Sequence, residues 1–396
     1  MRTMLARTVA FAAAVPLAVP FLAVSAQTAA ASPSMTPSAP VVVVNGLNNP
    51  RQLSLLANGT LLIAEAGKGG TVATISSPEG GDEGIGHTGS ISEVDNAATA
   101  SGTSPHRIIT GLLSAGAAGD PQNPPGSGAT GSDGVSARSL GSIAVQETVF
   151  PPNVLPAADL DFNGKLLRGA SNGTIDDVAD ITGYEVKHDP DKQGIDSDPY
   201  AVLVLANGST LVADAAGNDV LKVDRFHHIS LFHVFPNIVD ATCSDPSLQQ
   251  PPPALPGCQF VPTSLATDKF GHIFVGALGG LVPGEGRVVE LSPNGKEVVN
   301  TWTGFTSVTG VAVDRWGNLF VSQLFATQAN PINPMLQGVL TKVTGSTQTN
   351  VDVPFPAGLA VDRSGNVFVS TFSIATDAGF GVPGFDTSGQ VWRLTF

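Results

Sequence analysis

Acidic side chains stand near the ends of several short apolar segments in this sequence. Glu65, Asp133, Asp198 and Asp214 occupy such positions, and Arg51 is the cation of the same set. Carboxylate oxygens are preferred ligands of hard divalent cations, and an acidic surplus also attracts cationic molecules. We therefore predict a ligand site on these residues. A divalent cation is the one cofactor that the pattern suggests.

Neutral polar side chains at equivalent positions complete this predicted site. They are Ser132, Tyr200, Asn218, Thr263 and Gln323. A structural interpretation stays open beside the functional one, because charged groups at strand ends are ordinarily satisfied by their neighbours. In that interpretation Arg51 pairs with Glu65. Asp198 and Asp214 accept backbone N–H hydrogen bonds from glycine-rich turns.

Two short motifs imitate metal-binding or catalytic sequences. Residues 159–164 read DLDFNG, like the start of an EF-hand loop, but the twelfth position is Ala170 where that loop needs a glutamate. Residues 169–173 read GASNG, the pattern of a hydrolase nucleophile, which requires a helix directly afterwards. Residues 174–180 lack a helical pattern. No catalytic residue and no specific metal ligand is therefore assigned.

An internal repeat predicts the elements that position the polar residues. Residues 310–321 read GVAVDRWGNLFV, and residues 358–369 read GLAVDRSGNVFV. Each copy joins a strand of small and branched residues to a strand rich in valine and phenylalanine through a polar turn with glycine. The repeat predicts a β-hairpin, and a series of such hairpins is typical of a β-propeller.

Six copies of the hairpin can be placed along the chain. Their turn glycines are Gly59, Gly141, Gly208, Gly271, Gly317 and Gly365. The last three turns are 46 and 48 residues apart, close to the roughly 40–50 residues of a four-stranded blade. The earlier spacings of 82, 67 and 63 residues are longer. We therefore expect inserted loops at residues 115–131, 150–198 and 240–262.

The two ends of the chain complete the predicted fold. Third strands are expected at residues 286–291, 338–343 and 389–394, after which the last blade lacks a fourth strand. Pairing the valine-rich segment 41–44 with the final strand would supply that strand and remove an exposed edge. We predict an all-β, six-bladed β-propeller over residues 41–396, its ring closed by an N-terminal strand in the last blade.

Propeller geometry brings the polar residues together. In each hairpin the first strand starts, and the second strand ends, on the face opposite the glycine turn. The predicted ligand-binding residues near these points are Arg51, Glu65, Asp133, Asp198, Tyr200, Asp214, Asn218 and Gln323. We therefore expect a binding site at one mouth of the central channel.

Composition limits the partners and the compartment. The formal net charge is −14 without a cluster of Lys and Arg, which argues against nucleic acid and an anionic membrane surface as partners. Arg2 and Arg7 precede an apolar stretch that ends in small residues, which predicts a signal peptide at 1–26 and a flexible leader at 27–40. We then expect a Cys243–Cys258 disulfide in a secreted or periplasmic monomer.

Several stretches of the sequence resemble the ScyD/ScyE family. They are residues 45–51 (NGLNNPR), 64–70 (AEAGKGG), 88–90, 184–185, 196–200 (DSDPY), 212–219 (VADAAGND), 261–264 and 283–288. The resemblance implies an exported, NHL-like propeller of six blades, related to TolB-like propellers, whose activity is largely unassigned. Asp198 stands where the family pattern usually has Asn, and residues 284–286 and 85–87 also depart from it.

Two functional interpretations follow. The first is an extracellular binding or scaffold propeller that recognises a small molecule or a protein at the mouth of the channel. The alternative is a metal-dependent lactonase or lyase, in which channel carboxylates hold a divalent ion that polarises a carbonyl. Because a fold alone does not select a function, whether the protein is an enzyme stays open.

Overall fold

The computed structural model describes residues 37–76, 81–119, 123–245, 255–326, 338–379 and 387–396. These ranges are mainly β-structure, with one α-helix, α1 (Ile181–His188), and one 3₁₀ helix, η1 (Ala157–Asp161). The predicted signal peptide and most of the predicted leader lie outside the described residues. Within the described part of the chain, no helix combines the length and the apolar character that crossing a bilayer requires.

Three four-stranded sheets follow the order of the chain, each with its strands in sequence. The first contains β11 (Pro199–Val204), β12 (Thr210–Asp214), β13 (Asp219–Val223) and β14 (Ile229–Val234). The second contains β15 (Pro262–Thr267), β16 (Ile273–Ala277), β17 (Gly286–Leu291) and β18 (Val298–Phe305). The third contains β19 (Val308–Val313), β20 (Leu319–Gln323), β21 (Gly338–Thr344) and β22 (Thr347–Val353).

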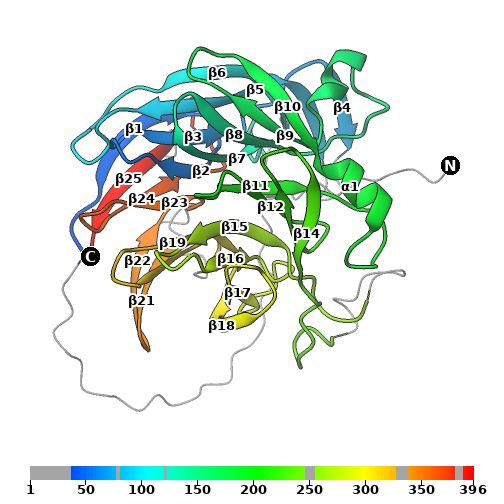
Figure 1. Cartoon of the computed structure of the whole chain (residues 1–396). Coiled ribbons are helices and arrows are strands. Elements are labelled where there is room, and N and C mark those ends of the chain that lie inside the picture. The colour runs from blue at the N-terminus through cyan, green and yellow to red at the C-terminus, as the bar shows by residue number, and fades with distance from the viewer. Residues whose placement is uncertain (1–36, 77–80, 120–122, 246–254, 327–337, 380–386) are drawn as a thin grey trace.

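A fourth four-stranded sheet joins the two ends of the described chain. Its strands are, in spatial order, β1 (Val41–Leu47), β25 (Gly389–Thr395), β24 (Asn366–Thr371) and β23 (Leu359–Val361). β1 and β25 are antiparallel, with Val44 opposite Val391. Figure 1 shows these two strands side by side although they lie at opposite ends of the colour scale. The valine-rich segment therefore has the strand partner that its sequence predicts.

The remaining strands form one sheet of nine, in the order β10–β9–β8–β7–β6–β5–β3–β2, with β4 paired to β5. They are β2 (Pro50–Leu55), β3 (Leu61–Glu65), β4 (Ala73–Ser76), β5 (Asp82–Val94), β6 (His106–Ala117), β7 (Thr130–Ser139), β8 (Ser142–Glu147), β9 (Lys165–Gly169) and β10 (Ile175–Asp180). The expectation of six separate four-stranded sheets is wrong here. The 12-residue β6 extends far enough for Ser114 and Ala115 to pair with the start of β7.

The innermost strands follow one another around a central axis. β2 contacts β7, and the contacts continue through β11, β15, β19 and β23, which contacts β2 again. Each of these strands forms a hairpin with the next strand in the sequence, as the repeat predicts. The turn glycines have positive φ except Gly141, which belongs to the least regular copy of the repeat.

The aspartate of the repeat explains why its turns form. Asp314 Oδ1 accepts hydrogen bonds from the backbone N–H groups of Trp316 and Asn318, at 2.9 Å each. Asp362 Oδ1 does the same for Ser364 and Asn366, at 2.7 and 2.9 Å. Because this side chain closes the turn from within, the turn can be predicted from a short stretch of sequence.

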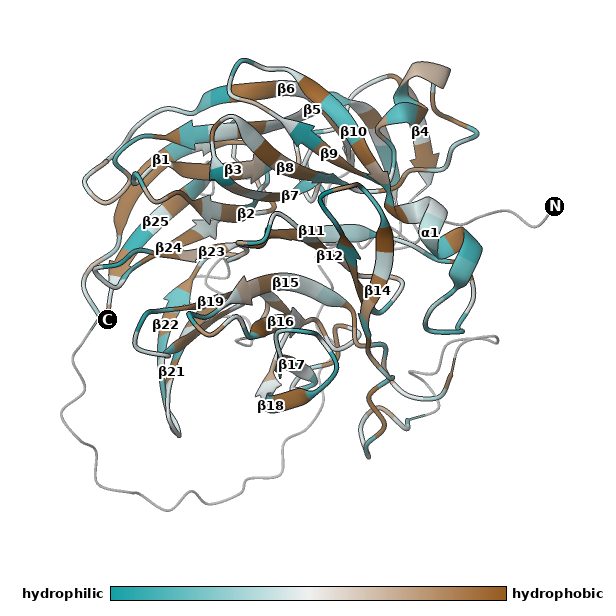
Figure 2. Cartoon of the chain, viewed as in Figure 1, coloured by the Kyte–Doolittle hydropathy of each residue, from teal (hydrophilic) through white to brown (hydrophobic). Residues whose placement is uncertain are grey.

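Apolar strand residues fill the spaces between neighbouring sheets, and Figure 2 shows hydrophobic segments along many of these strands. One cluster joins Phe274 and Val288 of the second sheet to Val308 and Val321 of the third. Such contacts position the strand ends, where the polar residues lie.

One of the expected loops differs from the prediction in an informative way. Residues 150–198 contain η1, β9, β10 and α1, so the expectation of a loop is wrong there. The turns at Gly141 and Gly208 are far apart in the sequence because this segment supplies the outer strands β9 and β10. The expected disulfide between Cys243 and Cys258 is confirmed, and it closes a segment between β14 and β15.

Candidate functional site

A break in strand register recurs at the start of five innermost strands. The residues at these breaks are Arg51, Asp133, Tyr200, Thr263 and Thr309. A β-bulge leaves one residue unpaired and re-aims its side chain. All five side chains are buried, and those of Arg51, Thr263 and Thr309 bond to the next innermost strand or to the segment that leads into it. Residues at these breaks, among them the predicted Arg51 and Thr263, therefore connect one innermost strand to the next.

Arg51 is the centre of this arrangement. Its Nε lies 3.0 Å from Asp133 Oδ1, and its terminal nitrogens donate to the backbone oxygens of Ser373 and Ala129. Asp133 Oδ2 accepts hydrogen bonds from Thr130 Oγ1 at 2.8 Å and from the Gly131 N–H at 3.0 Å. The side chains of Arg51 and Asp133 are each 1% exposed. It is therefore a buried, hydrogen-bonded ion pair.

The expected pairing of Arg51 with Glu65 is wrong. Glu65 Oε2 lies 2.7 Å from Arg107 NH2, and it accepts the Asn48 N–H at 2.8 Å. Ser92 donates to the other carboxylate oxygen. The bulge turns Arg51 toward Asp133 of β7, whereas Glu65 faces β5 and β6. Each acid consequently has its own arginine.

The other predicted residues are buried, with hydrogen bonds inside the protein. Asp214 accepts the N–H groups of Asp198 and Gly217 at 2.7 and 3.1 Å, as the structural interpretation expects. Asp198 accepts the hydroxyl of Thr148 at 2.5 Å. The remaining members also have partners: Ser132, Asn218, Thr263 and Gln323. A cavity beside Tyr200 and Thr263 measures about 20 Å³, which is room for about one water molecule.

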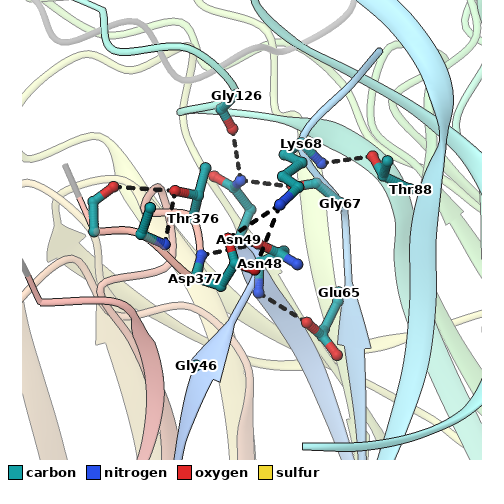
Figure 3. Close-up of polar contacts among 12 residues, drawn as sticks. Gly46, Asn48, Asn49, Glu65, Gly67, Lys68, Thr88, Gly126, Thr376 and Asp377 are labelled. Carbon is teal, nitrogen blue, oxygen red and sulfur yellow. Dashed lines mark hydrogen bonds and ion pairs between the residues drawn. The ribbon is translucent and has the colours of Figure 1, made fainter. Parts of the chain in front are cut away.

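The family-like motifs near the start of the chain have a structural role in this region (Figure 3). Asn49 Nδ2 donates to the backbone oxygens of Gly67 and Gly126 at 2.7 and 2.9 Å. Asn48 Oδ1 accepts the Asp377 N–H at 2.8 Å, from the other end of the chain. The asparagines therefore fasten three segments that are distant in the sequence.

Glu147 is a buried acid that the sequence analysis did not single out. It ends β8, as Glu65 ends β3, so the strand-end position was the available signal. Neither carboxylate oxygen has a hydrogen-bond partner, and the residue is fully buried. Burial, together with the nearby charge of Asp133, raises the pKa of Glu147 well above its ordinary value. At a pH between the pKa of Glu147 in the unfolded chain and its pKa in the folded protein, the folded protein therefore keeps a proton on Glu147 that the unfolded chain has lost.

Because of this proton, we expect the stability difference between Glu147→Gln and wild type to depend on pH. Above the ordinary pKa of 4.5, the unfolded chain loses the proton first, so wild-type stability falls as pH rises toward the folded-state pKa. The loss is at most about 1.4 kcal/mol per pH unit. We expect the variant to match wild type near pH 4 and to exceed it at pH 8 in urea unfolding. Glu297→Gln, at an exposed position, is the control and should show no such trend. If the free energies of unfolding of Glu147→Gln and wild type differed by the same amount at every pH, Glu147 would not hold the proton.

A cleft of about 340 Å³ opens beside α1. Its apolar wall is formed by Val149, Phe150, Pro152, Leu160, Val186 and Ile195, and its polar groups are Asn163, Lys165, Asp180, Thr182, Asp196 and Ser197. These residues follow β8 and precede β11, so the cleft lies on the predicted face but away from the axis. The sequence analysis missed it because its residues belong to the segment expected to be a loop.

Two charged residues of the cleft have structural partners. Lys165 Nζ lies 2.9 Å from Asp177 Oδ2, and Asp180 caps α1 by accepting the Gly183 N–H at 2.9 Å. Three large apolar side chains of the cleft are exposed: Leu160, Val186 and Ile195, at 38, 40 and 49%. The arrangement suits contact with an apolar surface more than acid–base chemistry.

Solved structures with a similar architecture are β-propellers. A luciferin-regenerating enzyme is 10% identical, with a TM-score of 0.50 over 91% of this chain and 96% of that chain. A glucose dehydrogenase-type oxidoreductase from Thermus thermophilus is 15% identical, with a TM-score of 0.48 over 90% and 99%. A gluconolactonase from Xanthomonas campestris is 9% identical, with a TM-score of 0.47 over 90% and 89%.

At these identities the comparison shows the fold and no activity. No protein-family model matches the sequence, and a search of curated proteins finds no match.

Proposed function

We propose that this protein is an exported β-propeller that binds a small, mainly apolar molecule in the cleft beside α1. The observation that carries the proposal is the cleft itself. Its volume of about 340 Å³ and its apolar wall with a few polar groups are typical of small-molecule sites. The exposed side chains of Val186 and Ile195 support the same conclusion, since exposed apolar side chains gathered at a cleft mark a binding surface.

The architecture in this proposal is a closed ring of six blades. The nine-stranded sheet divides into two blades where β6 meets β7 through two residue pairs, and the innermost strands contact one another in a complete circle. Pairing of β1 with β25 supplies the strand that the last blade would otherwise lack. Membership of the ScyD/ScyE family stays a proposal, supported by the stretches quoted above.

Export and monomeric state belong to the same proposal. The Cys243–Cys258 disulfide supports an oxidising compartment, and the sequence of residues 1–26 supports a cleaved signal. The net charge of −14 supports partners other than nucleic acid and anionic membranes. A protein ligand at the axial mouth is the weaker candidate, because the predicted residues there are buried.

The enzyme alternative has little support from the channel carboxylates. Asp133 is bound by Arg51, and Glu65 is bound by Arg107. An acid that already has a buried cationic partner and several hydrogen bonds is a poor ligand for a divalent ion. We therefore favour binding over a metal-dependent reaction in the channel.

The binding proposal is tested with 1-anilinonaphthalene-8-sulfonate, a fluorescent probe of apolar clefts. Native protein should bind about one probe molecule in the cleft. Val186→Asp and Ile195→Asp should each weaken binding by about tenfold to hundredfold, because each removes roughly 1.5–3 kcal/mol of apolar contact. Both positions are exposed, so folding should be retained.

Val298→Asp is the matched control, since Val298 is 54% exposed on β18, outside the cleft. Its probe affinity should equal that of wild type. Equal affinities for all three variants would place the apolar site elsewhere and overturn the proposal.

A further inference from the structure

Five carboxylates meet where α1 approaches the ends of β12 and β13. Glu185 lies in α1, and Asp189 and Asp191 lie in the loop that follows it. Asp214 is the last residue of β12, and Asp219 is the first residue of β13. We call these five residues the carboxylate cluster. Figure 1 shows α1 beside this sheet, on the flank of the propeller.

Three members of the cluster have the spacing of ligands around one ion. The ligand atoms offered by Glu185, Asp189 and Asp191 lie within 4.8 Å of one another. Oxygens on opposite sides of one Ca²⁺ ion are about 4.6–5.2 Å apart, because each Ca–O distance is about 2.3–2.6 Å. The spacing therefore fits a single calcium ion. Mg²⁺ needs shorter distances and a near-ideal octahedron, which acids drawn from a helix and a loop supply less well.

The two strand residues add charge at the same place. Asp214 and Asp219 are directly opposite each other in the β12–β13 pair, and like charges in that relation destabilise a sheet. A Cβ atom on Gly217 would lie 3.2 Å from Asp214 Cγ and 3.4 Å from Glu185 Oε2. The carboxyl groups of the helix and of the sheet therefore approach each other across a glycine.

Several oxygens of the carboxylate cluster are buried without a hydrogen-bond partner. They are both carboxylate oxygens of Asp219, Oε1 of Glu185 and Oδ1 of Asp189. Glu185 and Asp219 are each 1% exposed. Burying an unpaired carboxylate costs roughly several kcal/mol, so such a group takes up either a proton or a cation. The close spacing of Glu185, Asp189 and Asp191 favours one shared cation.

The electrostatic surroundings are acidic. Burial raises the pKa of Glu185 to about 8, and the charges of Asp214, Asp191 and Asp189 contribute to the same shift. Lys192, in the same loop, donates its Nζ hydrogens to the backbone oxygens of His188 and Asp189. Asn218 Nδ2 donates to Asp191 at 2.9 Å but carries no charge. Neither of these two contacts brings a positive charge onto a carboxylate oxygen of the carboxylate cluster.

We propose that the carboxylate cluster binds one Ca²⁺ ion, with Glu185, Asp189 and Asp191 as ligands and with the unpartnered, buried carboxylate of Asp219 facing it from the sheet. Asp214 balances the charge of the ion and is held by Ser197 and by two backbone N–H groups. The ion fastens α1 and its loop to the β12–β13 end. None of the five residues of the carboxylate cluster lines the cleft.

The test is a calcium titration of the full chain after removal of metals with EDTA. Isothermal titration calorimetry should show one Ca²⁺ per chain, and the melting temperature should rise with calcium concentration. Asp219→Asn and Glu185→Gln should each weaken calcium binding by more than about tenfold, since loss of a group that only orients a ligand already costs 10–100-fold. Mg²⁺ should bind more weakly.

Asp176→Asn, which changes an exposed acid on β10, is the matched control and should bind calcium as wild type does. If Glu185→Gln does not fold, as judged by circular dichroism, the half-buried Asp189→Asn carries the same expectation. Absence of heat and of a melting shift at millimolar calcium in the wild type would overturn the proposal. Wild-type affinity in the folded Asp219 and Asp189 variants would also overturn it.

Discussion

Replacing Arg51 with alanine is expected to lower the free energy of unfolding by about 3–5 kcal/mol, the cost of leaving a buried charge without its partner. The guanidinium bonds Asp133 and the backbone oxygens of Ser373 and Ala129, so it joins segments that are distant in the sequence. Asp133 would keep only the donors of Thr130 and Gly131. Urea unfolding of the variant and of wild type measures the effect.

Two further variants separate lost charge from lost packing. Lys68→Ala removes the exposed ion pair of Lys68 with Asp377, and we expect a change of about 0–1 kcal/mol. Arg51→Met combined with Asp133→Asn removes both buried charges and should recover more than half of the stability lost in Arg51→Ala. Equal effects of Arg51→Ala and Lys68→Ala would contradict a structural role for the buried pair.

The hairpins could be predicted because the information for each lies within about twelve residues. Asp314, Gly317 and the flanking branched residues close one turn by themselves, and Asp362 and Gly365 do the same in the next copy. The merging of two blades into one sheet could not be predicted in this way. It depends on how far β6 extends, and Ser114 and Ala115 give no local sign of their pairing partners.

Sequence patterns located the strand-end residues of the predicted site but assigned Arg51 the wrong partner. Strand-end positions located Asp133, Asp214 and their equivalents, because the repeat fixes where each strand ends. The bulge at Arg51 then decides which strand the guanidinium reaches, and that rotation has no signature in the sequence. Segment 150–198 concealed the cleft and the carboxylate cluster, because its weak apolar pattern resembles a loop.

Removing the β1 strand is expected to abolish the stable fold. Val43, Val44 and Leu47 are fully buried, and each contributes roughly 1.5–3 kcal/mol of apolar burial. Their sum is comparable with the whole stability of an ordinary domain, about 5–15 kcal/mol. Loss of β1 also exposes the edge of β25, which invites association between chains. A chain that starts at residue 48 should therefore melt without cooperativity or elute as aggregates.

A chain that starts at residue 37 is the matched control, because it retains β1 and its ladder with β25. It should melt as the longer chain does. Phe368→Ala tests the same core without truncation, since Phe368 packs in one cluster with Val43, Val44 and Leu47. A buried phenylalanine typically contributes about 3–5 kcal/mol, so this variant should remain folded but unfold at lower urea. Cooperative melting of the chain from residue 48 at the control's temperature would mean that β1 is dispensable, and that the ring is held by the contacts of β2 with β23.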